Sequence, residues 1–338
     1  MLVEAFSQGK RFSQPEANED SFVVIEGAGY AVIDGVTDRN GTRYAGMLSG
    51  QFASRVVKRA TERLLLDLEP PHSAGGLRYE GPQAFIGYLT AALHEAYARE
   101  GALAAAEADW KVRAGCTVVA ALHVGDRLEI VAVGDSGIRI NGGDLLWVRK
   151  PLDDVTSILR RETWRFFEAR GLPLDRVSAL AGFMTWRGTR HQASGDETAD
   201  PAVIEEIEHR ALEACKAHLP DAPQEELQLL IQHGIEHGQG EFQNVTGKTL
   251  GYGGLDGFAV PDRYVEHRSY PLSEIDSLEL FSDGYFEPAA SFGVAAWEAS
   301  FRAVEEADPH KIDGYISTKG TTSEALTDDR TYLGVRLK

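Results

Sequence analysis

The sequence predicts an α/β protein in which two antiparallel β-sheets pack together and helices cover their outer faces. Short apolar segments at 23–26, at 30–33 and within 115–148 are joined by hairpin-like turns such as "INGGDLLW". Such turns favour antiparallel pairing over a doubly wound parallel sheet. Two longer segments, 43–68 and 82–108, carry apolar residues at helical spacing and lie between these strands.

The pattern changes at residue 151. Helical spacing recurs near 152–169, 201–218 and 222–237, and a polar loop at 187–201 separates the first of these from the second. We therefore expect a largely helical insertion at about 151–257.

The strand pattern resumes after a glycine-rich stretch, "GYGGLDG". We expect strands at 263–270 and 277–284, a helix near 294–306 and a closing strand at 330–337. Because the closing segments continue the pattern that precedes the insertion, the chain is predicted to form one domain, 1–338, with the helices inserted into it.

Composition and charge narrow the functional classes. The chain has 338 residues and a formal net charge of -18, from 52 acids against 34 lysines and arginines. Such a chain is repelled by phosphate backbones and anionic lipids, which argues against nucleic acid and membranes as partners. No apolar stretch reaches the length of a membrane span, and the first residues lack the apolar core of a signal peptide. Together with the two distant cysteines, Cys116 and Cys215, these features predict a cytoplasmic protein. They do not determine its oligomeric state.

Acidic residues recur where predicted strands begin or end. An acid beside glycine is most often a turn residue, so one such motif is a weak signal. Five together indicate a shared cleft, because strand ends of one sandwich can converge. Carboxylate oxygens suit hard cations such as Mg²⁺ or Mn²⁺. The motifs are "NEDSFVV" (Glu19, Asp20), "VIDG" (Asp34), "AVGDSG" (Asp135), "LFSDGY" (Asp283) and "ALTDDRTYLGV" (Asp328, Asp329).

The order of these motifs resembles the metal-dependent protein serine/threonine phosphatases of type 2C, in a bacterial form. The resemblance runs from Asn18 to the end of the chain, apart from the insertion, and includes "AGCTVV" before a predicted strand. It implies a four-layer αββα sandwich. It also implies hydrolysis of phosphoserine and phosphothreonine esters in a phosphoprotein substrate, by in-line attack of a water bound between two Mn²⁺ or Mg²⁺ ions, with a third ion in some members.

The resemblance assigns the metal ligands residue by residue. Asp34 would bridge two ions, and the backbone carbonyl of Gly35 would be a further ligand. Asp283 would hold the first ion. Asp328, three residues before a threonine, matches the other ligand of that ion, and Asp329 takes its place if the register slips by one.

The remaining acids are assigned to the other ions. Glu19 or Asp20 would hold the second ion, partly through water, and Asp135 resembles the acid that binds a third, weaker ion.

Two departures from the family pattern stand out. Where the family has Asp-Gly-x-Gly-Gly, this chain has "DGVTD", so Thr37 and Asp38 replace both later glycines, and Asp38 could add a carboxylate. The family also places an arginine before the acidic pair to clamp phosphate, which a guanidinium can grip with two hydrogen bonds. Lys10 and Arg11 are the nearest cations here, and they are the candidate phosphate-binding residues.

Three rival functions place different demands on the sequence. A haloacid-dehalogenase-type phosphatase needs a general acid two residues after its nucleophile, where this chain has Val36. A cysteine-dependent phosphatase needs an arginine six residues after the thiolate, and neither cysteine has one. A catalytically weak or inactive binding module with the same fold is the third alternative.

The histidines His233 and His237 are predicted to form a surface pair and not a metal site.

Overall fold

The computed structural model describes residues 1–37, 40–68, 78–191 and 200–338. The chain divides into two compact units. The first contains residues 1–149, 253–303 and 324–338, and the second contains residues 150–252 and 304–323. Asp38 lies outside the described residues.

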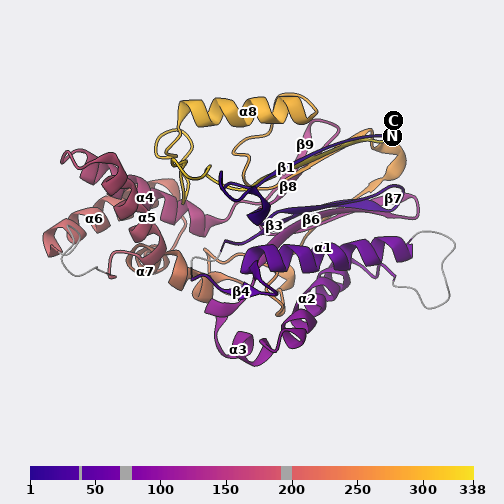
Figure 1. The fold of residues 1–338 in the computed structure, drawn as a ribbon, viewed down its shortest axis with the longest axis horizontal. Coiled ribbons are helices and arrows are strands. Elements are labelled where there is room, and N and C mark those ends of the chain that lie inside the picture. Colours follow the sequence, from indigo (N-terminus) through magenta and orange to yellow (C-terminus); the bar gives the residue numbers. More distant parts are fainter. Residues whose placement is uncertain (38–39, 69–77, 192–199) are drawn as a thin grey trace. The chain divides into compact units, whose positions relative to one another are not determined.

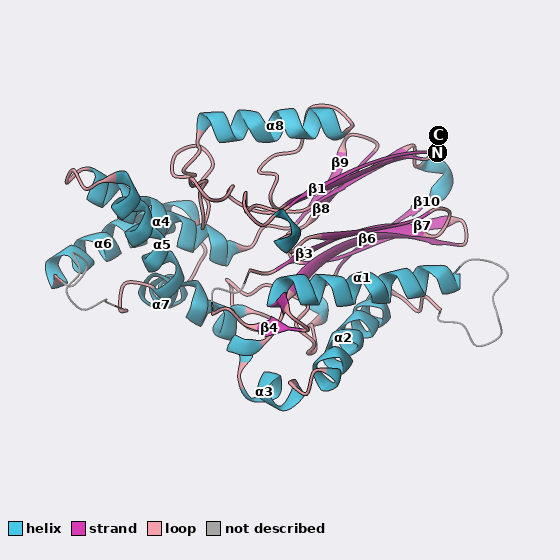
Figure 2. Ribbon diagram, in the orientation of Figure 1, coloured by secondary structure: helices cyan, strands magenta, loops and turns pink. Residues whose placement is uncertain are grey.

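The first unit is built on two five-stranded sheets (Figures 1 and 2). One sheet has the order β1 (Leu2–Gln8), β12 (Arg330–Arg336), β11 (Ser277–Phe281), β8 (Gly137–Ile140) and β9 (Asp144–Trp147). The other has the order β10 (Glu266–Pro271), β7 (Arg127–Val133), β6 (Cys116–Val124), β3 (Gly29–Gly35) and β2 (Ser21–Ile25). Neighbouring strands in both sheets are antiparallel, as predicted.

The alternation of side chains along β3 explains the layers. Tyr30 and Val32 point to one face of the sheet and join a core cluster with residues of the other sheet. Ala31 and Ile33 point to the opposite face and join the cluster that packs under the helices. Because successive residues of a strand face opposite sides, one fully apolar strand supplies two cores at once.

Helices cover the outer face of each sheet (Figure 1). On one side lie α1 (Ser49–Leu68) and α2 (Pro82–Arg99), followed by the short α3 (Leu103–Ala108). On the other side lies α8 (Val294–Ala307), whose Trp297 packs on Phe281 and Tyr332. The prediction of two antiparallel sheets flanked by helices is therefore confirmed.

Local differences from the predicted elements have identifiable causes. Helix α1 begins at Ser49 rather than at residue 43, because β4 (Arg43–Tyr44) and β5 (Met47–Leu48) form a small hairpin first. The predicted helix at 82–108 is two helices, since Gly101 adopts a φ of 67° and ends the first. Strand β1 was not predicted. Short 3-10 helices lie at Pro15–Ala17, Trp110–Val112, Asp262–Tyr264 and Leu272–Glu274.

The second unit is helical. It contains α4 (Pro151–Glu168), α5 (Leu174–Arg187), α6 (Pro201–His218) and α7 (Gln224–Phe242), with a common apolar core. Helix α5 was not predicted, and residues 304–323 join this unit although they are distant in sequence. No helix within the described residues is long and apolar enough to cross a membrane.

The histidine pair lies at an interruption of α7. Gly234 has non-helical angles there (φ 65°, ψ -168°), so His233 and His237 do not follow one regular helical face. Their ring centroids are 5.1 Å apart.

A buried carboxylate links α8 to its sheet. Glu279 of β11 is fully buried and accepts hydrogen bonds from Arg139 Nε (2.7 Å), Trp297 Nε1 (2.8 Å) and Tyr332 Oη (3.0 Å). A buried carboxylate is tolerated only when its oxygens are paired in this way.

Replacing Glu279 with alanine is expected to lower the free energy of unfolding by about 3–5 kcal/mol, because Arg139 would remain buried without its partner. Urea denaturation measures this change. As a control, Asp276→Ala removes an exposed ion pair with Lys338 and should change stability by less than about 1 kcal/mol. Equal effects of the two substitutions would contradict the role given to Glu279.

Candidate metal centre

The acids predicted from the strand ends lie at one end of the two sheets. Asp34 is near the end of β3, and Asp20 directly precedes β2, its antiparallel neighbour. Asp283 follows β11, and Asp328 precedes β12, which pairs with β11. Asp135 lies between β7 and β8. Antiparallel pairing places the end of one strand beside the start of the next, so these segments meet although they are far apart in sequence.

The carboxyl groups interact with one another. Those of Asp34 and Asp283 lie within hydrogen-bonding reach of each other. The charges of Asp20, Asp328 and Asp135 also act on Asp34. The structure thus brings together the acids that the sequence singled out.

Ser282 connects the two sheets at this point. Its hydroxyl donates a hydrogen bond to Asp20 Oδ2 (2.8 Å) and accepts one from the backbone N–H of Thr331 (2.9 Å). The backbone N–H of Asp20 is bound to Asn18 Oδ1 (2.9 Å). Asp20 is therefore fixed to its own loop and, through Ser282, to the other sheet. Sequence reasoning missed Ser282, although it directly precedes Asp283.

Two glycines allow the chain to pass close to these acids. A Cβ atom on Gly35 would collide with the carbonyl oxygen of Gly50, at the start of α1, and would lie 2.6 Å from the carbonyl oxygen of Glu19. A Cβ atom on Gly50 would lie 2.7 Å from Glu19 Oε1. Backbone packing therefore requires glycine beside Asp34.

Burial and mutual repulsion disfavour the charged forms of the central acids. Burial, the charge of Asp20 and the charge of Asp328 raise the pKa of Asp34 well above its usual value. Burial and the charge of Asp34 do the same to the pKa of Asp283. Burial, with the charge of Asp329, raises the pKa of Asp20 to about 7. Such carboxylates are stabilised by any cation that binds among them.

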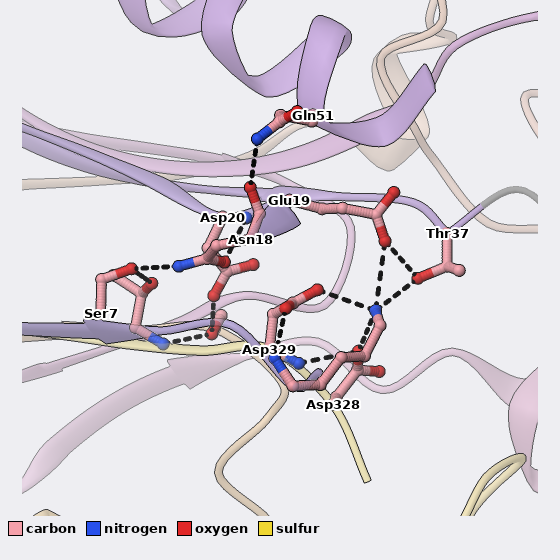
Figure 3. A network of polar contacts seen from close by, with 11 residues as sticks. Ser7, Asn18, Glu19, Asp20, Thr37, Gln51, Asp328 and Asp329 are labelled. Carbon is pink, nitrogen blue, oxygen red and sulfur yellow. Dashed lines mark hydrogen bonds and ion pairs between the residues drawn. The ribbon is translucent and has the colours of Figure 1, made fainter. Parts of the chain in front are cut away.

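Lys10 already supplies one positive charge. Its Nζ lies 2.9 Å from Asp328 Oδ1, 2.8 Å from Asp329 Oδ2, 3.1 Å from Glu19 Oε2 and 2.7 Å from Thr37 Oγ1. Figure 3 shows these acceptors converging, with the Thr37 hydroxyl also donating to Glu19 Oε2 (2.7 Å). Burial alone would lower the pKa of Lys10, but the charges of Asp328, Asp329 and Glu19 raise it well above its usual value.

The two candidate phosphate ligands have different surroundings. The ammonium of Lys10 is directed at carboxylates, and the residue is only 8% exposed. In this arrangement Lys10 is not placed to bind a phosphate group. Arg11 is exposed, and its guanidinium contacts Gln14 Oε1 at 3.5 Å. Asp329, assigned only as the alternative to Asp328, binds both the backbone N–H and the side chain of Lys10.

The donor set fits a divalent cation in its chemistry. Glu19 Oε1 and Asp20 Oδ1 are buried, and neither has a hydrogen-bond partner within the described part of the chain. Buried, unpaired carboxylate oxygens are the atoms that a hard cation would bind. As they now stand, however, no three side chains of His, Cys, Asp or Glu among the described residues form a group that could hold a metal ion.

Cys116 and Cys215 are free and buried. Burial raises the pKa of Cys116, and it raises the pKa of Cys215 to about 12. Neither thiol is present as the thiolate that a cysteine-dependent phosphatase would need.

Comparison with known proteins gives likenesses of low identity. No protein-family description and no curated protein matches the chain. Solved structures of bacterial serine/threonine phosphatases are among those that match. The Mycobacterium tuberculosis phosphatase PstP/Ppp is 15% identical, with a TM-score of 0.43, over 100% of this chain and 98% of that one. Stp1 from Staphylococcus aureus is 13% identical, with a TM-score of 0.42, over 100% and 96%.

The catalytic domain of PstP, solved in complex with two manganese ions, is 16% identical, with a TM-score of 0.40, over 98% of this chain and 96% of that one.

The free energy of unfolding of the metal-free protein should depend on the protonation of Asp20. A carboxyl group with a raised pKa in the folded state contributes stability below its unfolded pKa of about 3.8, and this contribution is lost as the pH rises through about 7. Asp20→Asn should therefore gain stability relative to the unsubstituted protein between pH 4 and pH 8, by on the order of 4 kcal/mol. Urea denaturation in EDTA at several pH values measures this gain, and a difference that is independent of pH would refute the assignment.

Proposed function

We propose that this protein is a metal-dependent phosphatase that hydrolyses phosphoserine and phosphothreonine esters of a protein substrate. The observation that supports the proposal is the meeting of Asp20, Asp34, Asp283 and Asp328 at one end of the paired sheets, with too little positive charge to balance them. A phosphate ester is itself anionic, so an acidic site can receive it only with the help of cations.

The proposed metal ligands are the acids that the fold brings together. Asp34 and Asp283 would hold Mn²⁺ or Mg²⁺ between the two sheets, with the Gly35 carbonyl, Asp328 and the pair Glu19 and Asp20 completing the ligands. When bound, such ions lower the pKa of water and neutralise phosphoryl oxygens. The chain's own contribution is to fix these carboxylates through Ser282 and the Gly35–Gly50 contact. Asp34 and Asp283 act as ligands and not as proton donors in this proposal.

Asp34→Asn and Asp283→Asn are each expected to lower the rate of hydrolysis of p-nitrophenyl phosphate and of phosphothreonine peptides by at least about 100-fold, because each removes a charged metal ligand. The measurement is kcat in Mn²⁺, with circular dichroism to verify folding. Asp126→Asn is a matched control, since this acid lies in the turn between β6 and β7. Near-normal turnover in either site variant would contradict the proposal.

One observation favours the non-enzymatic alternative. The charge of Lys10 partly balances the acids without any metal, which is what a binding module that has lost its ions would need. Isothermal titration calorimetry with Mn²⁺ separates the two functions. The absence of both Mn²⁺ binding and turnover would favour the binding module.

We also propose that the helical insertion, which the sequence placed at about 151–257, selects the phosphoprotein or docks a partner. Replacing 155–250 with a short linker should leave hydrolysis of p-nitrophenyl phosphate within about threefold, and should lower kcat/KM for a protein substrate more than tenfold. Circular dichroism and urea denaturation establish whether the remaining chain folds. Unchanged preference between the two substrates in a folded deletion variant would count against this role.

A further inference from the structure

Lys10 is held in place from three directions. Its backbone N–H donates to Asp329 Oδ1 (2.8 Å), and its backbone carbonyl accepts from the N–H of Leu326 (2.9 Å). Its ammonium then reaches Glu19, Asp328, Asp329 and Thr37, all within 3.1 Å. An ammonium group has three N–H donors, so four oxygens at this distance leave it no donor for a further ligand.

Two of these acceptors are proposed metal ligands. Glu19 Oε2 and Asp328 Oδ1 each face the ammonium directly, and Glu19 turns only its second oxygen, Oε1, away from it. Each hydrogen bond from the ammonium takes up a lone pair that could otherwise bind a metal ion, and the ammonium repels a divalent ion placed on the same carboxylate. The lysine and the metal therefore draw on the same two carboxylates.

Thr37 belongs to the same arrangement. It stands where the resembled family has glycine, and its hydroxyl accepts from Lys10 while donating to Glu19. The departure from the family pattern thus supplies a group that holds the ammonium in place. This agrees with the finding that the described acids form no group ready to hold a metal.

We infer that the ammonium group of Lys10 competes with a divalent metal ion for Glu19 and Asp328, and that Lys10 thereby sets how tightly the centre takes up metal. This inference rests on the proposed function, because it needs a metal to bind at the acids. Metal uptake then draws Glu19 and Asp328 away from the ammonium of Lys10, which becomes more accessible.

Lys10→Met tests the inference, because methionine has a similar length and no charge. Arg11→Met is the matched control, since it removes the same charge from the adjacent, exposed residue. Both variants and the unsubstituted protein are stripped with EDTA and titrated with MnCl₂ in a calorimeter, and their thermal midpoints are measured in EDTA. A purely structural role for Lys10 would weaken metal binding, so the direction of change separates the two roles.

We expect Lys10→Met to lower the dissociation constant for Mn²⁺ at least about tenfold and to lower the thermal midpoint in EDTA, since the acids lose their internal cation. Arg11→Met should change neither. Mn²⁺ binding by Lys10→Met alone, with none by the unsubstituted protein, would also support the inference. Unchanged or weaker binding by a folded Lys10→Met would overturn it.

A second measurement uses the unsubstituted protein, in case Lys10→Met does not fold. Acetic anhydride labels accessible lysines, and mass spectrometry quantifies the modification of Lys10 with and without MnCl₂, with Lys58 as internal reference. Mn²⁺ should increase the labelling of Lys10 severalfold. Equal or reduced labelling, with Mn²⁺ bound, would overturn the inference.

The two hypotheses fail in different ways. If the unsubstituted protein binds Mn²⁺ and Asp34→Asn does not, the metal centre stands whatever Lys10 does. If no variant binds Mn²⁺, the proposed function loses its metal and the inference fails with it.

Discussion

The structure depends on how a group of crowded carboxylates is kept together. Burial and mutual repulsion both oppose their charged forms, and the raised pKa values of Asp20, Asp34 and Asp283 measure that opposition. Only positive charge among the acids, or protons on them, can offset it. Lys10 supplies one charge to the group formed by Glu19, Asp328 and Asp329, and the rest of the cluster is left to protons or to an added cation.

The sandwich tolerates the repulsion among these acids, because the two sheets are stabilised by contacts that do not involve the site. The two faces of β3 supply two cores, and the hydrogen bond from Trp297 to the buried Glu279 fastens α8 to the other sheet. The loops can therefore carry unfavourable electrostatics while the strands stay paired. This separation is common in proteins whose functional residues lie on loops of a rigid scaffold.

The sequence was informative where its signals were local. Alternating apolar residues and hairpin turns predicted the antiparallel sheets, and the repeated placement of aspartate at strand ends predicted which acids meet. Strand β1 escaped prediction, because its sequence "LVEAFSQ" is short and half exposed, and its pairing partner β12 is more than 300 residues away. Helix α5 escaped because a turn of few residues joins it to α4.

The role of Lys10 could not have been read from the sequence for a related reason. A lysine near an acidic pair has no preferred direction until the fold brings Asp328 and Asp329 beside it. Sequence reasoning assigned it to phosphate on charge alone. The pairing of Thr37 with Glu19 was equally hidden, although the replacement of glycine by threonine marked the position as unusual.

The contact between Gly35 and Gly50 has a consequence for how the site can vary. Each glycine fills the space that a side chain on the other would need, and both lie against Glu19. A larger residue at one of these positions could not be compensated by a smaller residue at the other, because glycine is already the smallest. The first turn of α1 thus fixes the position of Gly35, so a shift of this helix would displace the neighbouring carboxylates of Glu19 and Asp34.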